Sequence, residues 1–550
     1  MKKRFISLLM LVVLALSVGM TSAGCAKTNE DMDSFTIWLP HEVPDGYSSY
    51  NDLTVYKKLE EISGMKVTYV HGTYNDVQQL WTGDYEEYDA IMLSDSMVNG
   101  KYPGGLEKAV SDDVFWDLTD YVEESMPNYI ETIDTVTTEN IEKYVKTDSG
   151  KYIGIYNVPV STQGPWYGYV VRRDWLEIYQ KAQGIINDGD AVKELVTYDD
   201  WENFLTYVKN NLNGGKAPLF LYYTGVDMVG TLNAGFGVSQ RLYLKNGTQV
   251  AYGAAQPEYK EYLDKMKDWR EKGLIDSEFS AVNPSDTSSS QPTVQAMDNY
   301  SQENGYTPAQ FAAFPMVYTY IHTYEALMGA MAQVYQGLLS RPQYDLMPVA
   351  APKLSAENKQ HIRLASQAPG YIAITKKVKS EAKLKKILQW FDYLYSDEGA
   401  TLMNYGIENE SYTMVNGEPK FTETITNPGN NLTFSDAISI NCSLNFVFKY
   451  DWTRELQVVN EEERNAMEEV WMGDDASYVL PTLVLNDSES RVAEQIELNI
   501  STFVNEFTVS YILGKNSDTF DQFVGKLKNT YNVDRLVEAY SSAYARFNAR

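Results

Sequence analysis

Aromatic residues are abundant in this sequence, and several of them stand beside acidic or amide residues. The 550 residues include 42 tyrosines and 10 tryptophans, but only four histidines. Tyrosine and tryptophan side chains offer flat apolar faces with one polar edge. Sugar rings present flat C–H faces between hydroxyl groups, so aromatic faces beside carboxylate and amide groups would suit carbohydrate. Most of these aromatic residues are nevertheless expected to fill the core and the surface.

Three candidate ligand-binding residues stand at the ends of expected strands near the N-terminus. Trp38 and His41 lie at the end of the apolar segment SFTIWLP, and Asp95 follows the segment AIML. In parallel sheets, ligands bind beyond the carboxyl ends of the strands. A carboxylate at such a place, as on Asp95, can accept hydrogen bonds from hydroxyl groups. Trp38 could instead cap the core, because it stands beside a proline.

The elements that position these residues alternate between strand and helix over the first 170 residues. We expect strands at 34–40, 65–70 and 90–93, and a helix at 53–64 that Gly64 ends. Connections of this length predict right-handed crossovers and a parallel sheet. The apolar face of the helix should consist of Val55, Leu59 and Ile62.

Three longer helices are expected later in the chain, and each carries an apolar stripe typical of core packing. The first lies within 256–279, with Pro257 in its first turn and Gly273 at its end. The second spans 380–399 and the third spans 487–514. Their stripes are Tyr259, Tyr262, Leu263, Met266 and Trp269; Leu384, Ile387, Leu388, Phe391 and Leu394; and Val492, Ile496, Ile500, Phe503 and Phe507.

The first residues have the pattern of a secretion signal. Three basic residues precede an apolar run, as in a secretion signal. The run is too short for a membrane-spanning helix, which needs about 20 apolar residues. No second apolar stretch could span a bilayer. The segment SAGC resembles a bacterial lipobox, in which the cysteine sulfur carries diacylglycerol, although leucine is usual at its first position. The alternative is ordinary cleavage near Ala23, with Cys25 incidental. We expect a signal peptide at 1–24, a lipid on Cys25 and a polar tether at 25–33.

Composition and charge argue against several classes of protein. Only Cys442 remains besides Cys25, so no intrachain disulfide is expected. Length alone predicts two or more domains or lobes. The formal net charge of −29 becomes −32 when a leader with three basic and no acidic residues is removed. This acidity disfavours nucleic acid and anionic membrane surfaces as partners, although it also simply keeps a secreted protein soluble.

Five stretches, spread over nearly the whole chain, occur in the order found in one known family. They are TIWLP with YKKLEEISGMKV and YDAIML; FWDLTDYVEESMPNY; SGKYIGIYNVPV with YVVRRDWLE; VAYGAAQPEYKEYLDKMKDWREKGLIDSEF; and YGIENESYTMVNGEPKFT with FVNEFTVSYILG and AYSSAYARF. In this order they resemble the extracellular solute-binding proteins of family 1, in particular the long lipoprotein receptors of sugar ABC importers. Residues 281–365 match the family poorly.

The resemblance implies an α/β chain with a two-lobed, periplasmic-binding-protein-like fold of type II. A carbohydrate, expected to be an oligosaccharide, would bind between lobes that close by a hinge motion, and the permease of an ABC importer would recognise the closed form. The receptor would be a monomer outside the cytoplasm, on a Gram-positive cell surface, held to the membrane by its lipid anchor alone. The N-terminal lobe would comprise residues 34–160 and 366–405, and the C-terminal lobe would comprise residues 161–365 and 406–550. The chain would cross between the lobes near Val158-Pro159, near 368–374 and near Tyr405-Gly406.

The resemblance also directs attention to aromatic and polar residues in further loops. Trp166 and Tyr167 lie in a turn with glycine and proline, just past the first crossing, where their rings could stack on a sugar. An apolar strand would explain Tyr318 and Tyr320 equally well, and Glu408 could instead cap a turn. The further candidates are Tyr223, Asp227, Tyr318, Tyr320, Glu408, Asn409 and Trp452.

No catalytic group, cofactor or metal site is expected. The loop 184–194 lies where some members of the family carry a calcium loop, but its acidic residues lack the full ligand spacing. His322 and His361 have no evident metal partner. Two other functions stay open. The chain could be a receptor for a peptide or another small solute, or a secreted glycoside hydrolase, which would need two carboxylates about 5–9 Å apart.

Overall fold

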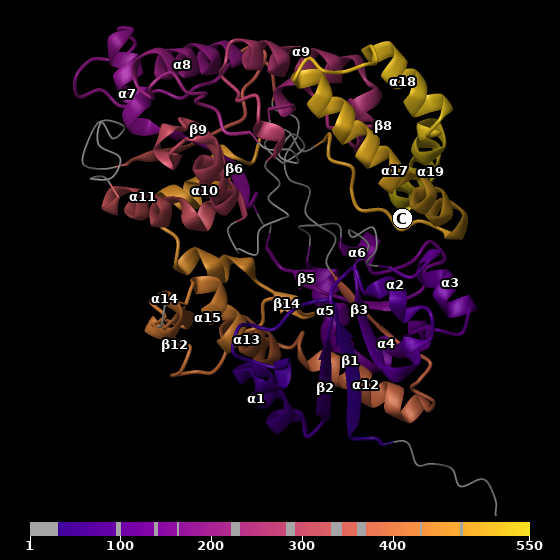
Figure 1. Cartoon of the computed structure of the whole chain (residues 1–550). Helices are drawn as coiled ribbons and strands as arrows, with labels where there is room; N and C mark the ends of the chain where they lie inside the picture. The colour runs from indigo at the N-terminus through magenta and orange to yellow at the C-terminus, as the bar shows by residue number, and fades with distance from the viewer. Residues whose placement is uncertain are drawn as a thin grey trace, which may run out of the picture.

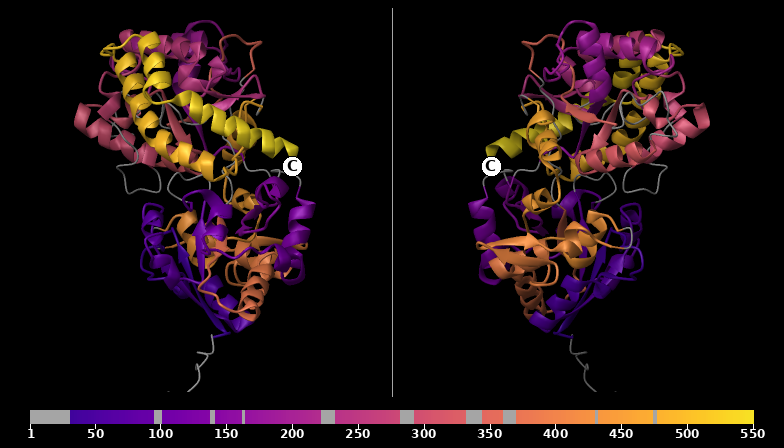
Figure 2. Two further views of the ribbon diagram at one scale, coloured as in Figure 1. Left: turned by 90° about the vertical axis from the view of Figure 1, so that its right-hand side faces the viewer. Right: turned by 90° about the vertical axis from the view of Figure 1, so that its left-hand side faces the viewer.

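Two lobes, one above the other in Figure 1, make up the part of the chain that the structure describes. The computed structural model describes residues 31–94, 101–136, 141–161, 164–221, 232–281, 292–331, 344–359, 370–429, 432–473 and 477–550. Both side views in Figure 2 show the same division. The N-terminal strands lie in the lower, first lobe, and the last three helices lie mainly in the upper, second lobe.

A five-stranded mixed sheet forms the centre of the first lobe, in the order β2-β1-β3-β11-β4. Strand β1 (Ser34–Leu39) runs parallel to β2 (Lys66–His71) and β3 (Ala90–Leu93), which confirms the predicted parallel pairing. Strand β11 (Tyr371–Ile374) is antiparallel to both β3 and β4 (Gly154–Tyr156). The carboxyl ends of β1, β2 and β3 therefore share one edge of the sheet.

Helices and one hairpin surround this sheet. Helix α1 (Thr54–Ser63) ends at Gly64, whose φ of 66° lies in the left-handed region that glycine tolerates. The other elements of the first lobe are α2 (Val77–Leu80), α3 (Gly105–Ser111), α4 (Thr119–Ser125), α5 (Pro127–Thr135), α6 (Ile141–Tyr144), α12 (Glu381–Tyr393), α13 (Asp397–Tyr405), β12 (Tyr412–Val415), β13 (Glu418–Phe421), α14 (Glu423–Thr426) and α15 (Phe434–Asn441).

The apolar face predicted for α1 is only partly correct. Val55 and Leu59 are buried, but Ile62 is 48% exposed. Ile62 lies in the last turn, where it lines a surface groove with Ile407 and Tyr412. The core side of the helix is completed by Tyr56 instead.

The second lobe is built around a three-stranded antiparallel sheet in the order β10-β6-β9. Its strands are β6 (Tyr167–Arg172), β9 (Ala313–Val317) and β10 (Leu346–Val349). A hairpin and many helices complete this lobe. They are β7 (Leu242–Lys245), β8 (Gln249–Tyr252), α7 (Arg173–Ala182), α8 (Tyr198–Asn211), α9 (Pro257–Glu271), α10 (Pro292–Asn304), α11 (Ile321–Ala330), α16 (Glu461–Asn465), α17 (Asp487–Ile512), α18 (Phe520–Asn529) and α19 (Val533–Ala549).

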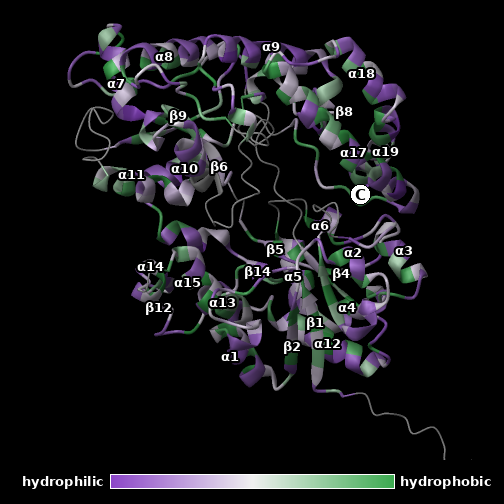
Figure 3. Ribbon diagram, in the orientation of Figure 1, coloured by the Kyte–Doolittle hydropathy of each residue, from purple (hydrophilic) through white to green (hydrophobic). Residues whose placement is uncertain are grey.

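The predicted stripes of the long helices are confirmed with small changes. All five stripe residues of α9 and all five of the 380–399 helix are buried. In α17, Val492 and Phe503 are only partly buried. Figure 3 shows hydrophobic residues along the first-lobe strands and mainly hydrophilic ones on the outer side of α9. Side-chain periodicity therefore predicted these packing faces well.

The segment between α13 and residue 450 packs on the first lobe. The hydroxyl groups of Tyr56 and Ser443 lie 3.1 Å apart, and Phe446 joins the first-lobe core. In this packing the chain leaves the first lobe after Tyr450, which differs from the predicted limit between residues 405 and 406. The reason is that α15 buries its apolar residues beside α1, a long-range contact that no local sequence signal marks.

Candidate ligand site between the two lobes

Two short strands run side by side where the chain crosses between the lobes. Strand β5 (Val158–Pro159) pairs in parallel with β14 (Lys449–Tyr450). The N–H of Val160 donates to the carbonyl oxygen of Tyr450 at 2.9 Å. The Ser161 hydroxyl donates to Oδ1 of Asp451 at 3.1 Å. These paired segments form a narrow hinge.

A buried carboxylate joins the hinge to the second lobe. The hydroxyl of Tyr318, in a turn after β9, donates to Oε2 of Glu455 at 2.9 Å, and the hydroxyl of Tyr450 donates to Oε1 at 2.9 Å. Burial, together with the Glu455 charge, raises the pKa of both tyrosines well above the usual value. Both hydroxyls therefore remain protonated and can serve as donors.

Arg454, the neighbour of Glu455, attaches the same turn to the first lobe. Its guanidinium is fully buried and donates to the carbonyl oxygens of Asn404 at 2.9 Å and Ser443 at 2.7 Å. Glu455 and Arg454 both belong to the 3-10 helix Trp452–Gln457. One turn of chain thus contacts both lobes at the hinge.

On the first lobe, the loop after β1 is fixed by an imidazole. His71 accepts from the N–H of Tyr50 through Nε2 at 3.2 Å, so its Nδ1 carries the proton and donates to the carbonyl oxygen of His41 at 2.9 Å. Burial lowers the pKa of His41 to about 4. His41 is therefore neutral at pH 7, and its ring meets that of Tyr74 edge to face with 5.6 Å between centroids.

Tyr74 extends this polar and aromatic edge toward β3. Burial raises its pKa, and a hydrogen bond from Ser94 partly offsets that effect. Ser94 ends the described part of the β3 loop, immediately before Asp95. A cavity of about 170 Å³ opens nearby, lined by Glu42, Tyr50 and other residues. It is smaller than the about 300–1,000 Å³ of typical ligand pockets.

The structure places Trp38 in the core. Only 4% of its surface is exposed. A Cβ atom added at Gly72 would lie 2.7 Å from its indole ring, so the backbone after β2 packs directly on that ring. The core-capping alternative describes this residue better than a ligand contact does.

On the second lobe, three aromatic candidates gather at the end of the sheet nearest the hinge. Trp166 is 41% exposed, and Tyr167 and Tyr320 are partly buried. The N–H of Tyr318 donates to the carbonyl oxygen of Trp166 at 3.0 Å, which brings these segments together. The Tyr318 ring itself is buried, and its hydroxyl is hydrogen-bonded to Glu455. Trp166, Tyr167 and Tyr320 can therefore offer ring faces to a ligand.

Sequence reasoning missed one acidic group near these rings. Asp298 on α10 is partly buried, and its charge acts on Tyr320. Burial raises the pKa of Asp298 to about 6. No hydrogen bond from another described residue reaches its carboxyl group. The sequence signal that could have identified it is an acidic residue between Met297 and Tyr300, which stand at helical spacing.

Three other candidates lie away from these residues or in the core. Glu408 lines the exposed groove beside Ile62 on the first lobe. Asn409 has a φ of 65°, and its N–H donates to the carbonyl oxygen of Tyr412 at 2.7 Å, as expected of a tight turn. Trp452 is 4% exposed and packs in the second-lobe core. Asp95, Tyr223, Asp227 and Cys25 lie outside the described residues.

Acidic groups of the loop 184–194 bond within the loop and to Lys181 on α7. Asp190 accepts from the N–H of Asn187 at 2.7 Å, and Asp188 pairs with Lys181 at 2.7 Å. Within the described ranges, no group of three or more His, Cys, Asp or Glu side chains is placed to hold a metal ion.

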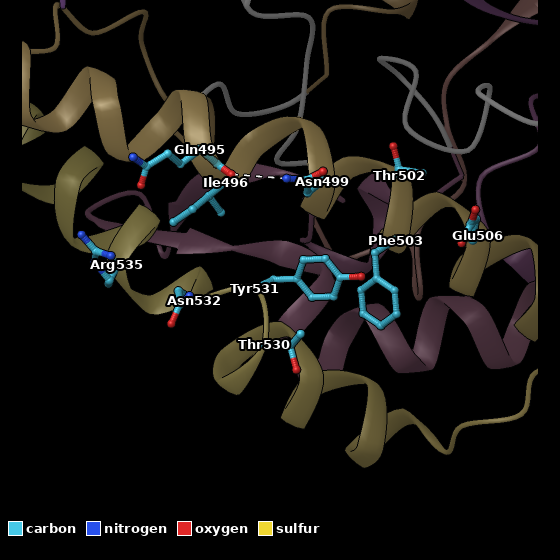
Figure 4. Close-up of a pocket in the computed structure, with 10 residues that line it drawn as sticks. All are labelled: Gln495, Ile496, Asn499, Thr502, Phe503, Glu506, Thr530, Tyr531, Asn532 and Arg535. Atoms are coloured by element: carbon cyan, nitrogen blue, oxygen red, sulfur yellow. Dashed lines mark hydrogen bonds between the residues drawn. The ribbon is translucent and has the colours of Figure 1, made fainter.

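A larger cavity lies elsewhere, between α17 and the start of α19. It has a volume of about 520 Å³. Figure 4 shows Gln495 and Asn499 along one wall and the stacked rings of Phe503 and Tyr531 at its base. Every lining residue belongs to the second lobe. A ligand bound there would contact one lobe only and could not drive the lobes together.

Comparisons with known proteins agree with a two-lobed solute-binding fold. No family model matches the chain. The Bacillus subtilis polygalacturonan/rhamnogalacturonan-binding protein YtcQ is 21% identical, over 97% of this chain and 98% of its own length. Lipoprotein LipO of the same organism is 23% identical, over 72% of each chain. The Streptococcus pneumoniae ABC-transporter substrate-binding protein FusA, solved with kestose, matches with a TM-score of 0.65, 15% identity, and 94% and 99% coverage.

These similarities confirm the predicted fold class: the chain has the α/β, two-lobed fold of solute-binding proteins. None of the helices in the described ranges is long and apolar enough to cross a membrane.

Proposed function

We propose that this chain is an extracytoplasmic receptor that binds a carbohydrate, in particular an oligosaccharide, between its two lobes and delivers it to the permease of an ABC importer. The observation that carries the proposal is the pair of hinge strands, β5 and β14, flanked on both lobes by aromatic and polar side chains. His41 and Tyr74 stand on the first lobe. Trp166, Tyr320 and Asp298 stand on the second.

The ring faces and polar groups of this site supply different parts of the binding free energy. Micromolar affinity corresponds to about −8 kcal/mol. Stacking on Trp166, Tyr167 and Tyr320 contributes about 1 kcal/mol for each ring, which is too little alone. Hydrogen bonds to a charged group such as Asp298 add about 1.5–3 kcal/mol each. A neutral His41 offers one donor and one acceptor, as a hydroxyl-rich ligand requires.

Contacts to both lobes also explain how binding would be signalled. A ligand that touches His41 on one lobe and Trp166 on the other is bound more tightly when the lobes approach each other. Such differential affinity selects the closed arrangement. The permease would then distinguish the loaded receptor from the empty one by shape. The relatives support this reading, because YtcQ is named for polysaccharide binding and FusA was solved with kestose.

A lipid on Cys25 would keep the receptor close to its transporter. The apolar leader, the SAGC segment and the polar residues that follow support this part of the proposal. The relative LipO is named as a lipoprotein. The relatives are named for binding or lipidation and not for catalysis, so we assign the chain no reaction.

Titration against a ligand panel tests the function directly. Isothermal titration calorimetry and native mass spectrometry should show one oligosaccharide bound per chain, with quenching or a shift of tryptophan fluorescence. The panel should contain neutral and acidic oligosaccharides, peptides and monosaccharides. Binding of peptides alone would replace the carbohydrate assignment. Release of shortened sugars without any partner protein would show a glycoside hydrolase instead.

A further inference from the structure

The lobes meet at a second place, away from the hinge. There the C-terminal end of α19 lies against α6 and the turn that follows it, as Figures 1 and 2 both show. The ring of Phe547 lies 5.7 Å from that of Tyr144, and the ammonium of Lys143 lies 4.9 Å from the Phe547 ring centre. Tyr144 contacts the cores of both lobes.

Two arginines make this contact polar and directional. Arg550 donates through Nη1 to the carbonyl oxygens of Lys143 at 2.5 Å and Lys146 at 2.8 Å, and through Nη2 to Asp148. Arg546 donates through Nε to Asp148. One carboxylate of the first lobe thus receives both guanidinium groups of the second. We name Asp148, Arg546 and Arg550 the C-terminal latch.

Each side of the latch is fixed within its own lobe. The Asp148 turn is held to α3, because the hydroxyl and N–H of Ser149 both donate to Glu107, at 2.6 and 3.1 Å. On the second lobe, Arg546 donates from both Nη atoms to Glu489 on α17, at 2.7 and 2.5 Å. When the lobes move relative to each other, the contacts of Asp148 with Arg546 and Arg550 must therefore change.

Beside the latch, close packing of α3 on the start of α17 adjoins an open cavity. A cavity of about 440 Å³ lies between α3 and residues 484–488, and both lobes line it. Among the described residues, the hydrogen bonds and ion pairs that join the lobes occur at the hinge and at the latch, with none from the strand-end loops of His41 or Tyr74 to the second lobe. The described arrangement is thus held at the hinge and at the latch, where α3 also packs against the start of α17.

We propose that the C-terminal latch sets the equilibrium between separated and closed lobes by stabilising the separated arrangement, so that Asp148, Arg546 and Arg550 are positioning residues for ligand binding. A rotation of one lobe about the β5–β14 hinge displaces atoms in proportion to their distance from the axis. The guanidinium contacts to carbonyl oxygens tolerate little displacement, because the fork geometry of arginine is rigid. Ligand-driven closure then has to break them. This inference rests on the proposed function only where it concerns affinity.

Removal of the latch should therefore tighten ligand binding. When only a fraction of the molecules is competent to close, the apparent dissociation constant rises in inverse proportion to that fraction. Asp148→Ala removes the first-lobe carboxylate and leaves the Arg546–Glu489 pair intact. We expect the apparent dissociation constant to fall about 3- to 10-fold.

Asp148→Glu, which retains the charge, should restore values near those of the natural chain. Lys526→Ala, which removes the Lys526–Asp518 pair inside the second lobe, is the matched control and should leave affinity unchanged.

A distance measurement without ligand tests the latch independently of the carbohydrate proposal. Spin labels at Leu327→Cys on α11 and Ser435→Cys on α15, in a chain with Cys25→Ala, report the lobe separation by pulsed electron paramagnetic resonance. Cys442 is fully buried and burial raises its pKa to about 12, so it should not react with the label.

We expect Asp148→Ala to move the distance distribution toward shorter values. An unchanged distribution would overturn the latch, and so would weaker ligand binding by the variant. A shifted distribution with no carbohydrate bound by any form would overturn the proposed function and leave the latch intact.

Discussion

The hydroxyl of Tyr318 in the second lobe donates to Glu455 at 2.9 Å, in a turn that Arg454 fastens to the first lobe. Tyr450 donates to the other oxygen of the same carboxylate. The hinge therefore consists of more than two strands. It includes a nearly buried anion whose two donors come from different segments of the chain, and which lies where the lobes pivot.

Replacing that anion should weaken the fold measurably. Glu455→Gln retains the shape of the side chain but loses its charge. The amide nitrogen of glutamine cannot accept a hydrogen bond, so one of the two tyrosine hydroxyls loses its acceptor. Leaving a buried donor unsatisfied costs about 1–3 kcal/mol. Thermal or urea unfolding should show a loss of stability in this range. Glu408→Gln, at an exposed position, is the control and should change stability by less than about 0.5 kcal/mol. Equal stability of both variants would argue against the role given to Glu455.

Trp166 and Trp38 should respond oppositely to truncation. Trp166→Ala removes a 41% exposed ring beside the hinge, so affinity should fall about 10-fold while the melting temperature changes little. Trp38→Ala empties a site in the first-lobe core and should cost about 3–5 kcal/mol of stability. Calorimetric titration and thermal melts on both variants measure the contrast. A large stability loss for Trp166→Ala, with unchanged affinity, would mark that ring as part of the core.

Asp298 predicts a specific pH dependence of stability. Burial raises its pKa to about 6 in the folded chain, above the usual value of 3.8. The folded state therefore keeps a proton that the unfolded state releases between these values. The resulting stability is complete below about pH 4 and is lost as the pH rises through 6. Asp298→Asn should remove this decline and be the more stable form at pH 7.

The size of the Asp298 effect should be modest, since the carboxyl is only partly buried and water screens it. We expect a gain on the order of 1 kcal/mol at pH 7 and almost none at pH 4. Melting temperatures of both forms at pH 4, 5, 6 and 7 measure it. A difference that is constant across this range would assign the effect to packing and not to ionisation. Affinity for ligand should fall in the same variant, because a charged acceptor is lost.

The proposed lipid on Cys25 predicts that this residue keeps the mature chain with membranes. Cys25→Ala should move the protein from the membrane fraction to the medium when cells are fractionated, because the variant lacks the sulfur that would carry the lipid. Metabolic labelling with a fatty acid should be lost in parallel. Cys442→Ala is the matched control and should stay membrane-bound. A Cys25→Ala protein that remains in the membrane fraction would refute lipid anchoring at this position.

Local sequence signals predicted much of the framework. Strand β3 lies at the predicted residues, Pro257 begins α9, and Ser380 caps α12. These features depend on short-range patterns of apolar spacing and capping. The antiparallel strands β11 and β4 and the placement of α15 depend on partners hundreds of residues away, which a single sequence does not encode visibly.

The candidate site was predicted less completely. Trp166, Tyr167, Tyr320 and His41 are exposed or partly buried, but Trp38, Tyr318 and Trp452 are buried in cores. Sequence cannot separate these groups, because a strand end presents aromatic residues both inward and outward. Asp298 was missed since it lies on a helix and not after a strand. Its burial follows from the helices and tyrosines packed around it.

The Glu455 carboxylate at the hinge couples the evolution of positions 318, 450 and 455. If residue 455 became apolar, Tyr318 and Tyr450 would each retain a hydroxyl with no acceptor inside the protein. Phenylalanine at both places would relieve that cost, and no single exchange would. Among homologues that keep this hinge, positions 318, 450 and 455 should therefore be inherited as a set, changing jointly or not at all.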